Sequence, residues 1–216
     1  MEEEVKIPIG KIVLEGNLVL PKGAEGIVLF AHGSGSSRFS PRNQYVAKEL
    51  QKKDVATLLF DLLTKEEEAV DMRTGHLRFD VEFLAERLIG ATKWLKEKSE
   101  TKNLNVGYFG ASTGAGAALV AAAKYPEEVH AVVSRGGRPD LAMDYLSKVK
   151  APTLLVVGGK DKPVIEINKE TMACLQCLKK LEIVPGASHL FEEPGTLEEV
   201  SRLAADWFVR YLRGKR

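Results

Sequence analysis

Gly110-Ala111-Ser112-Thr113-Gly114 lies between an apolar run, Leu104–Phe109, and an alanine-rich run, Ala115–Ala123. The first run is typical of a buried strand and the second of a helix, so the five residues predict a sharp strand–turn–helix connection. Small residues two before and two after the serine fit such a turn, because a larger side chain would collide with the neighbouring strand or helix. The turn would raise the serine Oγ above the sheet edge and place the next N–H at the positive end of a helix. This geometry favours an attacking hydroxyl beside an anion site.

The rest of the chain alternates between strand-like and helix-like segments, which predicts an α/β fold with a mostly parallel sheet of about eight strands. We expect a single domain over residues 1–216. In such sheets, binding sites form beyond the carboxyl ends of the strands. The expected strands are Val5–Ile9, Lys11–Leu20, Ile27–Ala31, Val55–Phe60, Leu104–Phe109, Val129–Ser134, Thr153–Val157 and Lys180–Val184; the expected helices are Pro41–Lys52, Phe79–Lys98, the run after Ser112, Leu141–Leu146, Val164–Leu178 and Leu197–Leu212.

Composition excludes several classes of protein. Hydrophobic residues make up 44% of the chain, charged residues 28%, and the net charge is +1. A balance so close to neutral argues against nucleic acid as a partner. No apolar run approaches the about 18 residues that a membrane-spanning helix needs. The acidic start, Met1 to Glu4, is unlike a secretory signal, so we expect a cytoplasmic protein.

Two further residues complete a Ser-Asp-His set with Ser112. Asp161 follows the expected strand Thr153–Val157, and His189 follows the expected strand Lys180–Val184. A serine hydroxyl needs a base, and the base needs an orienting acid. The order Ser, Asp, His is the chain order that this fold class uses. Asp61 is a rival acid on a different strand, and Asp161 is preferred because it follows the strand before the histidine strand.

An oxyanion site needs two donors near Ser112. The segment His32-Gly33-Ser34-Gly35-Ser36-Ser37 follows another expected strand, and its glycines allow backbone N–H groups to turn toward the serine. The N–H groups of Ser34 and Thr113 are the expected pair. His32 is an alternative base, and we favour a structural role in which it shapes this loop by hydrogen bonding.

These motifs, together with Gly158-Gly159-Lys160-Asp161 and Gly186-Ala187-Ser188-His189-Leu190-Phe191, make the chain resemble the α/β-hydrolase superfamily. Within it, the chain is similar to the dienelactone-hydrolase-like group of small enzymes without a cap. The resemblance covers essentially the whole chain. It implies Ser112 as nucleophile, Asp161 as acid, His189 as base and no cofactor or metal. Dienelactone hydrolase proper has a cysteine where this chain has Ser112, so the resemblance implies the fold and not the dienelactone substrate.

Two segments are candidates for the substrate pocket. Residues 62–78 leave a strand at its carboxyl end and form either a solvated acidic turn or short helix, or a flap whose Arg73, His76 or Arg78 reaches the substrate. Arg135 and Arg138 follow another strand and either bind a substrate carboxylate or form salt bridges with Asp140 or the Glu192-Glu193 pair.

Cys174 and Cys177 form a Cys-x-x-Cys pattern, which suggests a redox pair or a metal site. The segment looks helical and lacks a second pair of metal ligands. We therefore expect two reduced cysteines on one face of a helix.

The sequence predicts a serine hydrolase that cleaves an ester or similar small acyl substrate through an acyl-enzyme. Acyl transfer or perhydrolysis is an alternative in which another nucleophile replaces water. A catalytically silent or redesigned hydrolase-fold protein, acting as a binding module or scaffold, is the alternative from another class. We expect a monomer or a small homo-oligomer.

Overall fold

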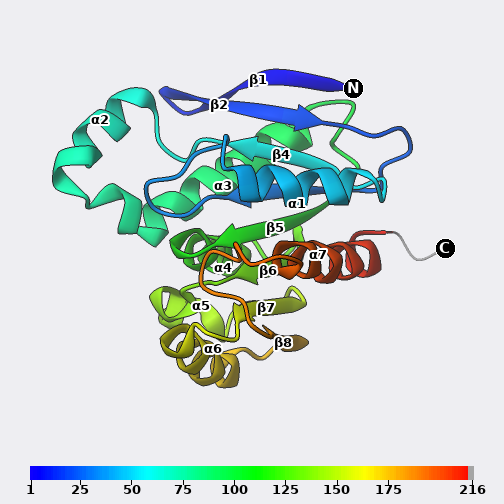
Figure 1. Ribbon diagram of the computed structural model, residues 1–216. Helices are drawn as coiled ribbons and strands as arrows, with labels where there is room; N and C mark the ends of the chain where they lie inside the picture. The colour runs from blue at the N-terminus through cyan, green and yellow to red at the C-terminus, as the bar shows by residue number, and fades with distance from the viewer. Residues whose placement is uncertain (214–216) are drawn as a thin grey trace.

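A computed structural model describes residues 1–213. Its eight strands form one sheet in the order β1-β2-β4-β3-β5-β6-β7-β8 (Figure 1). β1 and β2 are antiparallel to each other, β2 is antiparallel to β4, and the other pairs are parallel. The strands are β1 Glu2–Ile9, β2 Ile12–Val19, β3 Gly26–Ala31, β4 Ala56–Phe60, β5 Asn105–Ala111, β6 Val129–Arg135, β7 Thr153–Gly158 and β8 Lys179–Val184.

Seven α-helices and two short 3-10 helices join the strands of the described chain, and the expected α/β-hydrolase fold is confirmed. The α-helices are α1 Pro41–Gln51, α2 Lys65–Thr74, α3 Val81–Glu97, α4 Thr113–Lys124, α5 Met143–Leu146, α6 Lys162–Cys174 and α7 Thr196–Leu212; the 3-10 helices are η1 Leu77–Phe79 and η2 Pro139–Ala142. No helix within residues 1–213 combines the length and the apolar character needed to cross a bilayer.

The central strands are apolar throughout because both faces of the sheet are covered. Along β3, Ile27 and Leu29 face a core shared with α3 and α4, whereas Val28 and Phe30 face a core shared with α1 and α7. Figure 1 shows α1 and α7 together on one side of the sheet. The Phe30 ring lies 4.9 Å from the Phe109 ring in the second core, which locks β3 against β5.

The connections place the site. In the strand order of the sheet, β4 lies next to β3 in the direction of β1, whereas β6 lies next to β5 in the direction of β8. The carboxyl ends of β3 and β5 are therefore neighbours at the point where the winding direction changes, and crevices form at such points. The loop at residues 32–37 leaves β3 there, and Ser112 leaves β5 there.

Candidate active site

Ser112 occupies the turn that the sequence predicts. It has φ 52° and ψ −120°, a conformation that side-chain-bearing residues rarely adopt, and it directly precedes α4. A Cβ on Gly110 would lie closer than 3.0 Å to the backbone of Ala115, and a Cβ on Gly114 would do the same to the carbonyl oxygen of Ala31. The small residues on both sides of Ser112 are thus required by close backbone contacts.

Asp161 and His189 meet at the same edge of the sheet. The Nδ1–H of His189 donates a hydrogen bond to Oδ2 of Asp161 across 2.6 Å. The Asp161 side chain is 13% exposed and the His189 side chain is 39% exposed, so the carboxylate lies behind the ring and the ring faces the solvent side. Asp61, the rival acid, accepts instead from the backbone and the guanidinium of Arg38.

Backbone contacts hold the His189 ring near the turn. A Cβ built on Gly136 would lie 3.4 Å from Cε1 of His189, so the ring packs on this residue. The preceding residue, Arg135, accepts the backbone N–H of Ser112 at its carbonyl oxygen across 3.2 Å. Glu193 fixes the histidine loop by accepting the Ser188 N–H across 2.9 Å. A hollow of about 210 Å³ joins these loops and is lined by Gly33, Ser34, Ser36, Ser40, Arg42, Asn43, Ala111, Ser112, Arg135, His189 and Leu190.

The residues that carry the two expected oxyanion donors, Ser34 and Thr113, are in direct contact. Thr113 is the first residue of α4, so its N–H has no acceptor within the helix. The Ser34 N–H donates to Oγ1 of Thr113 across 2.9 Å. The loop after β3 is therefore tied to the first residue of α4, and the Ser34 N–H already has an acceptor.

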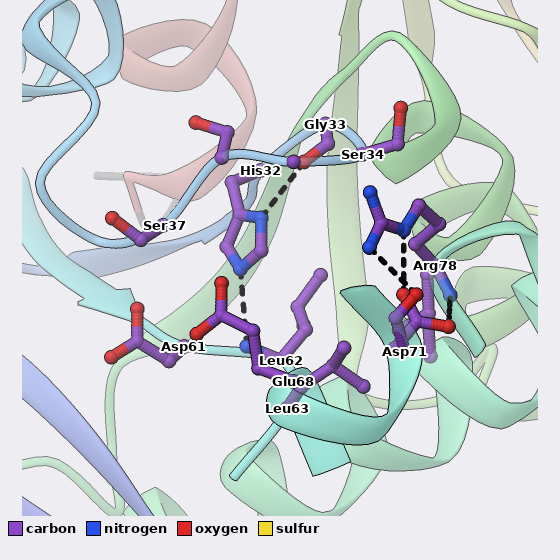
Figure 2. Close-up of a pocket in the computed structure, with 13 residues that line it drawn as sticks. His32, Gly33, Ser34, Ser37, Asp61, Leu62, Leu63, Glu68, Asp71 and Arg78 are labelled. Carbon is purple, nitrogen blue, oxygen red and sulfur yellow. Dashed lines mark hydrogen bonds and ion pairs between the residues drawn. The ribbon is translucent and has the colours of Figure 1, made fainter. Parts of the chain in front are cut away.

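His32 has the structural role that the sequence favours (Figure 2). The Leu62 N–H donates to its Nε2 across 3.1 Å, so the proton is assigned to Nδ1, which lies 3.0 Å from the Gly33 carbonyl. Burial lowers the pKa of His32, although the Gly33 carbonyl, Asp61 and Glu68 act in the opposite direction. The neutral ring bridges the loop after β3 to the end of β4.

Residues 62–78 form the short helix α2, which projects beside the sheet in Figure 1, followed by a turn. The buried carboxylate of Asp71 accepts from Nε of Arg78 across 2.6 Å and from the Leu77 N–H across 2.7 Å. The contact between Asp71 and Arg78 is visible in Figure 2, where Arg78 lies beside the loop after β3. A second pocket lies between the loop at residues 32–37 and the segment at residues 61–78. Of the three expected flap residues, Arg78 alone lines it. His76 is exposed and bonded to Thr74 Oγ1, and Arg73 is also exposed, so neither borders the hollow at Ser112.

Arg135, the last residue of β6, and Arg138, which follows the strand, have different surroundings. Arg138 pairs with Asp140, with its Nη2 2.7 Å from Oδ2, and it does not line the hollow. This is the salt-bridge alternative, and the expectation that Arg138 meets substrate is not supported by its placement. Arg135 is 7% exposed and does line the hollow. Sequence reasoning missed Arg42 and Asn43, which join it there.

The prediction that Cys174 and Cys177 share one helix face is wrong. Helix α6 ends at Cys174, and Leu175 continues in an extended conformation with its side chain fully buried. Cys177 lies beyond the helix, where its Sγ is 3.7 Å from Oγ1 of Thr153. Both cysteines are free, and residues 1–213 contain no cluster of three or more metal-ligating side chains.

The sequence matches a known protein family over most of its length. The model of the "Dienelactone hydrolase family" matches residues 15–212. The chain belongs to the dienelactone hydrolase family. A crystal structure of a dienelactone hydrolase from Anabaena variabilis is 63% identical, covers 99% of both chains and superposes with a TM-score of 0.97. Est1E from Butyrivibrio proteoclasticus has a TM-score of 0.80 at 16% identity, over 96% of this chain and 98% of its own, which shows the shared fold.

One relative has a name that describes a different activity. A Mycobacterium tuberculosis protein, provisionally named a phosphoribosyl transferase, is 57% identical over 213 residues, 99% of this chain. This chain spans 47% of that protein, about half its length. The name describes the whole relative, and more than half of that protein lies outside the match.

Proposed function

We propose that this member of the dienelactone hydrolase family is a serine hydrolase that cleaves an ester or similar small acyl compound. The observation that carries the proposal is the hydrogen bond between His189 and Asp161 at the edge of the hollow that Ser112 lines. Ser112 and His189 thus line one hollow, and Asp161 supports the His189 ring from outside it. The catalytic set itself, the single-domain boundary, the cytoplasmic location and the oligomeric state stay predictions.

In the first half of the reaction, Ser112 Oγ attacks the substrate carbonyl while Nε2 of His189 takes its proton. Asp161 holds the ring by the Nδ1 bond and stabilises the charged imidazolium. Within the described residues no hydrogen bond yet joins Ser112 Oγ to His189, and such bonds commonly tighten only when substrate is bound. The leaving group takes the proton from His189 as the tetrahedral intermediate collapses to the acyl-enzyme.

The N–H of Thr113 supports the oxyanion, and the N–H of Ser34 is the second proposed donor. Because Ser34 donates to Thr113 Oγ1, its N–H must be shared with the oxyanion or exchange to it during the reaction. In the second half, His189 activates water, which releases the acid and restores Ser112.

Turnover of p-nitrophenyl butyrate by wild type, Ser112→Ala and Ser188→Ala tests this proposal. Ser188 lies on the histidine loop and is the matched control. We expect Ser112→Ala to lower kcat by at least about 10³-fold and Ser188→Ala to change it less than about tenfold. Equal activities in wild type and Ser112→Ala would reject Ser112 as the nucleophile.

A further inference from the structure

Arg135 is a buried cation without an acidic partner. It ends β6, is 7% exposed and lines the hollow that holds Ser112 and His189. Its Nε is buried without an acceptor, and among residues 1–213 its guanidinium makes neither an ion pair nor a hydrogen bond. The guanidinium carbon lies over the ring of Phe191, 5.8 Å from the ring centre. A buried charge is costly unless an opposite charge or hydrogen-bond acceptor compensates for it.

Arg42 adds a second cation to the same hollow. It lies in the first turn of α1, and its Nε is also buried without an acceptor. One Nη1 contact, 3.2 Å to Glu192, reaches a carboxylate that is 65% exposed on the outside of the site. No acidic side chain of the described chain lines the hollow.

The electrostatics of Arg135 agree with this geometry. Burial, and after it the charge of Arg42, lowers the pKa of Arg135 to about 10. The side chain therefore keeps its charge at neutral pH in surroundings that disfavour it. Asn43, 2% exposed beside these arginines, also has an Oδ1 without a donor. Three buried side-chain atoms at the hollow, Nε of Arg135, Nε of Arg42 and Oδ1 of Asn43, thus have no partner among the described protein groups.

We propose that Arg135 and Arg42 bind a phosphate-type dianion of the substrate, so that the acyl compound cleaved at Ser112 carries a phosphate group. This inference rests on the proposed hydrolase function. A dianion can pair with Arg135 and also with Arg42, whose one acidic contact is the exposed Glu192 on the outside of the site, whereas a carboxylate is matched by Arg135 alone. Guanidinium forks also match the paired oxygens of a phosphate, and three such oxygens supply acceptors for both side chains.

Three p-nitrophenyl esters with one leaving group test the charge of the bound portion. They are the butyrate, which is neutral, the half-ester of succinate, which is a monoanion, and the ester of 3-phosphonopropionate at its carboxyl group, which is a dianion in a buffer above the second pKa of the phosphonate. For Arg135→Gln we expect kcat/KM to fall about 10²-fold on the phosphonate, about tenfold on the succinate and less than about threefold on the butyrate. Arg42→Gln should give the same order with smaller losses. Arg138→Gln, the control, should leave the selectivity unchanged because Arg138 pairs with Asp140 outside the hollow.

Binding of inorganic phosphate gives a readout that does not depend on turnover. At constant ionic strength, phosphate should raise the Tm of wild type and of Ser112→Ala, and it should not raise that of Arg135→Gln. Without phosphate, removing an unpaired buried charge should leave the Tm unchanged or higher. If Arg135→Gln fails to fold, Arg135→Lys and Arg42→Gln serve in its place.

The outcomes separate the two proposals. Equal losses of kcat/KM on the three esters would show that Arg135 has a structural role and would overturn the phosphate site. The same conclusion would follow if every variant had a lower Tm that does not respond to phosphate, because the fold itself would then be damaged. A larger loss on the succinate ester than on the phosphonate ester would show that the site binds a carboxylate, which would also overturn the phosphate proposal. Phosphate binding that depends on Arg135, with no ester turned over, would keep the site and reject the hydrolase function.

Discussion

The backbone N–H of Lys160 donates a hydrogen bond to the carbonyl oxygen of Ala187 across 2.9 Å. This contact ties the loop that carries Asp161 to the loop that carries His189. Gly158 permits the approach, because a Cβ at this position would lie closer than 3.0 Å to the carbonyl oxygen of Ala187. The spacing between acid and base therefore depends on a backbone contact at the end of β7.

Gly158→Ala should separate the two loops. The added methyl group meets backbone, which cannot rotate away, so we expect a loss of about 1–3 kcal/mol in the free energy of unfolding. We also expect a fall in kcat of at least about tenfold, because small displacements of catalytic groups are costly. Gly186→Ala is the comparison variant, since its Cβ meets nothing within 4 Å and its cost is limited to the backbone strain of a φ of 74°. Urea unfolding and ester turnover measure the two effects, and unchanged kcat in a destabilised Gly158→Ala would contradict the argument.

Asp161→Asn should impair catalysis through the orientation of His189. The amide can no longer stabilise an imidazolium, so we expect kcat to fall about 10²–10⁴-fold with little change in KM. Asp61→Asn, which releases Arg38, should lower the Tm and have the smaller effect on kcat. The reverse ranking of the two variants in kcat would make Asp61 the catalytic acid.

Thr113→Val should expose the role of the Thr113 hydroxyl. The substitution keeps the branched shape and removes the acceptor of the Ser34 N–H. We expect the loop after β3 to lose its anchor and kcat to fall about tenfold, while Thr113→Ser, which retains the hydroxyl, stays near wild type. A rise in kcat for Thr113→Val would show instead that the hydroxyl competes with the oxyanion for this N–H.

The stability of the protein should depend on pH through His32. Burial lowers the pKa of His32 in the folded state, so the unfolded chain binds the proton more readily. The free energy of unfolding therefore falls as pH drops below about 6.5. His32→Gln lacks this contribution, so the stability difference between wild type and variant should narrow from pH 7.5 to pH 5.5. The exposed His76→Gln is the control. A constant difference across this range would mean that His32 does not stay neutral in the fold.

Local patterns were sufficient to predict most of the fold. The continuous apolar runs of β3 and β5 and the turn at Ser112 identify strands and their connection without long-range information. The boundary of β1 was missed because Glu2 and Glu3 resemble a solvated start, yet they pair with Val19 and Leu18 of β2. The end of α6 was missed because Leu175 leaves the helix to fill the core, and tertiary packing of this kind leaves no local signal.

The candidate site was predictable to the same extent. Positions at strand ends identify Ser112, Asp161 and His189, since the carboxyl ends of parallel strands share one edge. The sequence left open which arginine after β6 faces the hollow, and only the structure separates Arg135 from the locally paired Arg138. Arg42 comes from α1, whose position depends on its packing against α7 and β4, so no spacing along the chain indicates it.

Covalent labelling tests the central claim most directly. A fluorophosphonate reacts with a serine that a neighbouring base activates, and mass spectrometry of the digested protein then locates the modified residue. We expect one label per folded chain on the peptide that contains Ser112, slower labelling in His189→Ala, and none in Ser112→Ala. Labelling at another serine, or no labelling of a folded wild-type protein, would contradict the account.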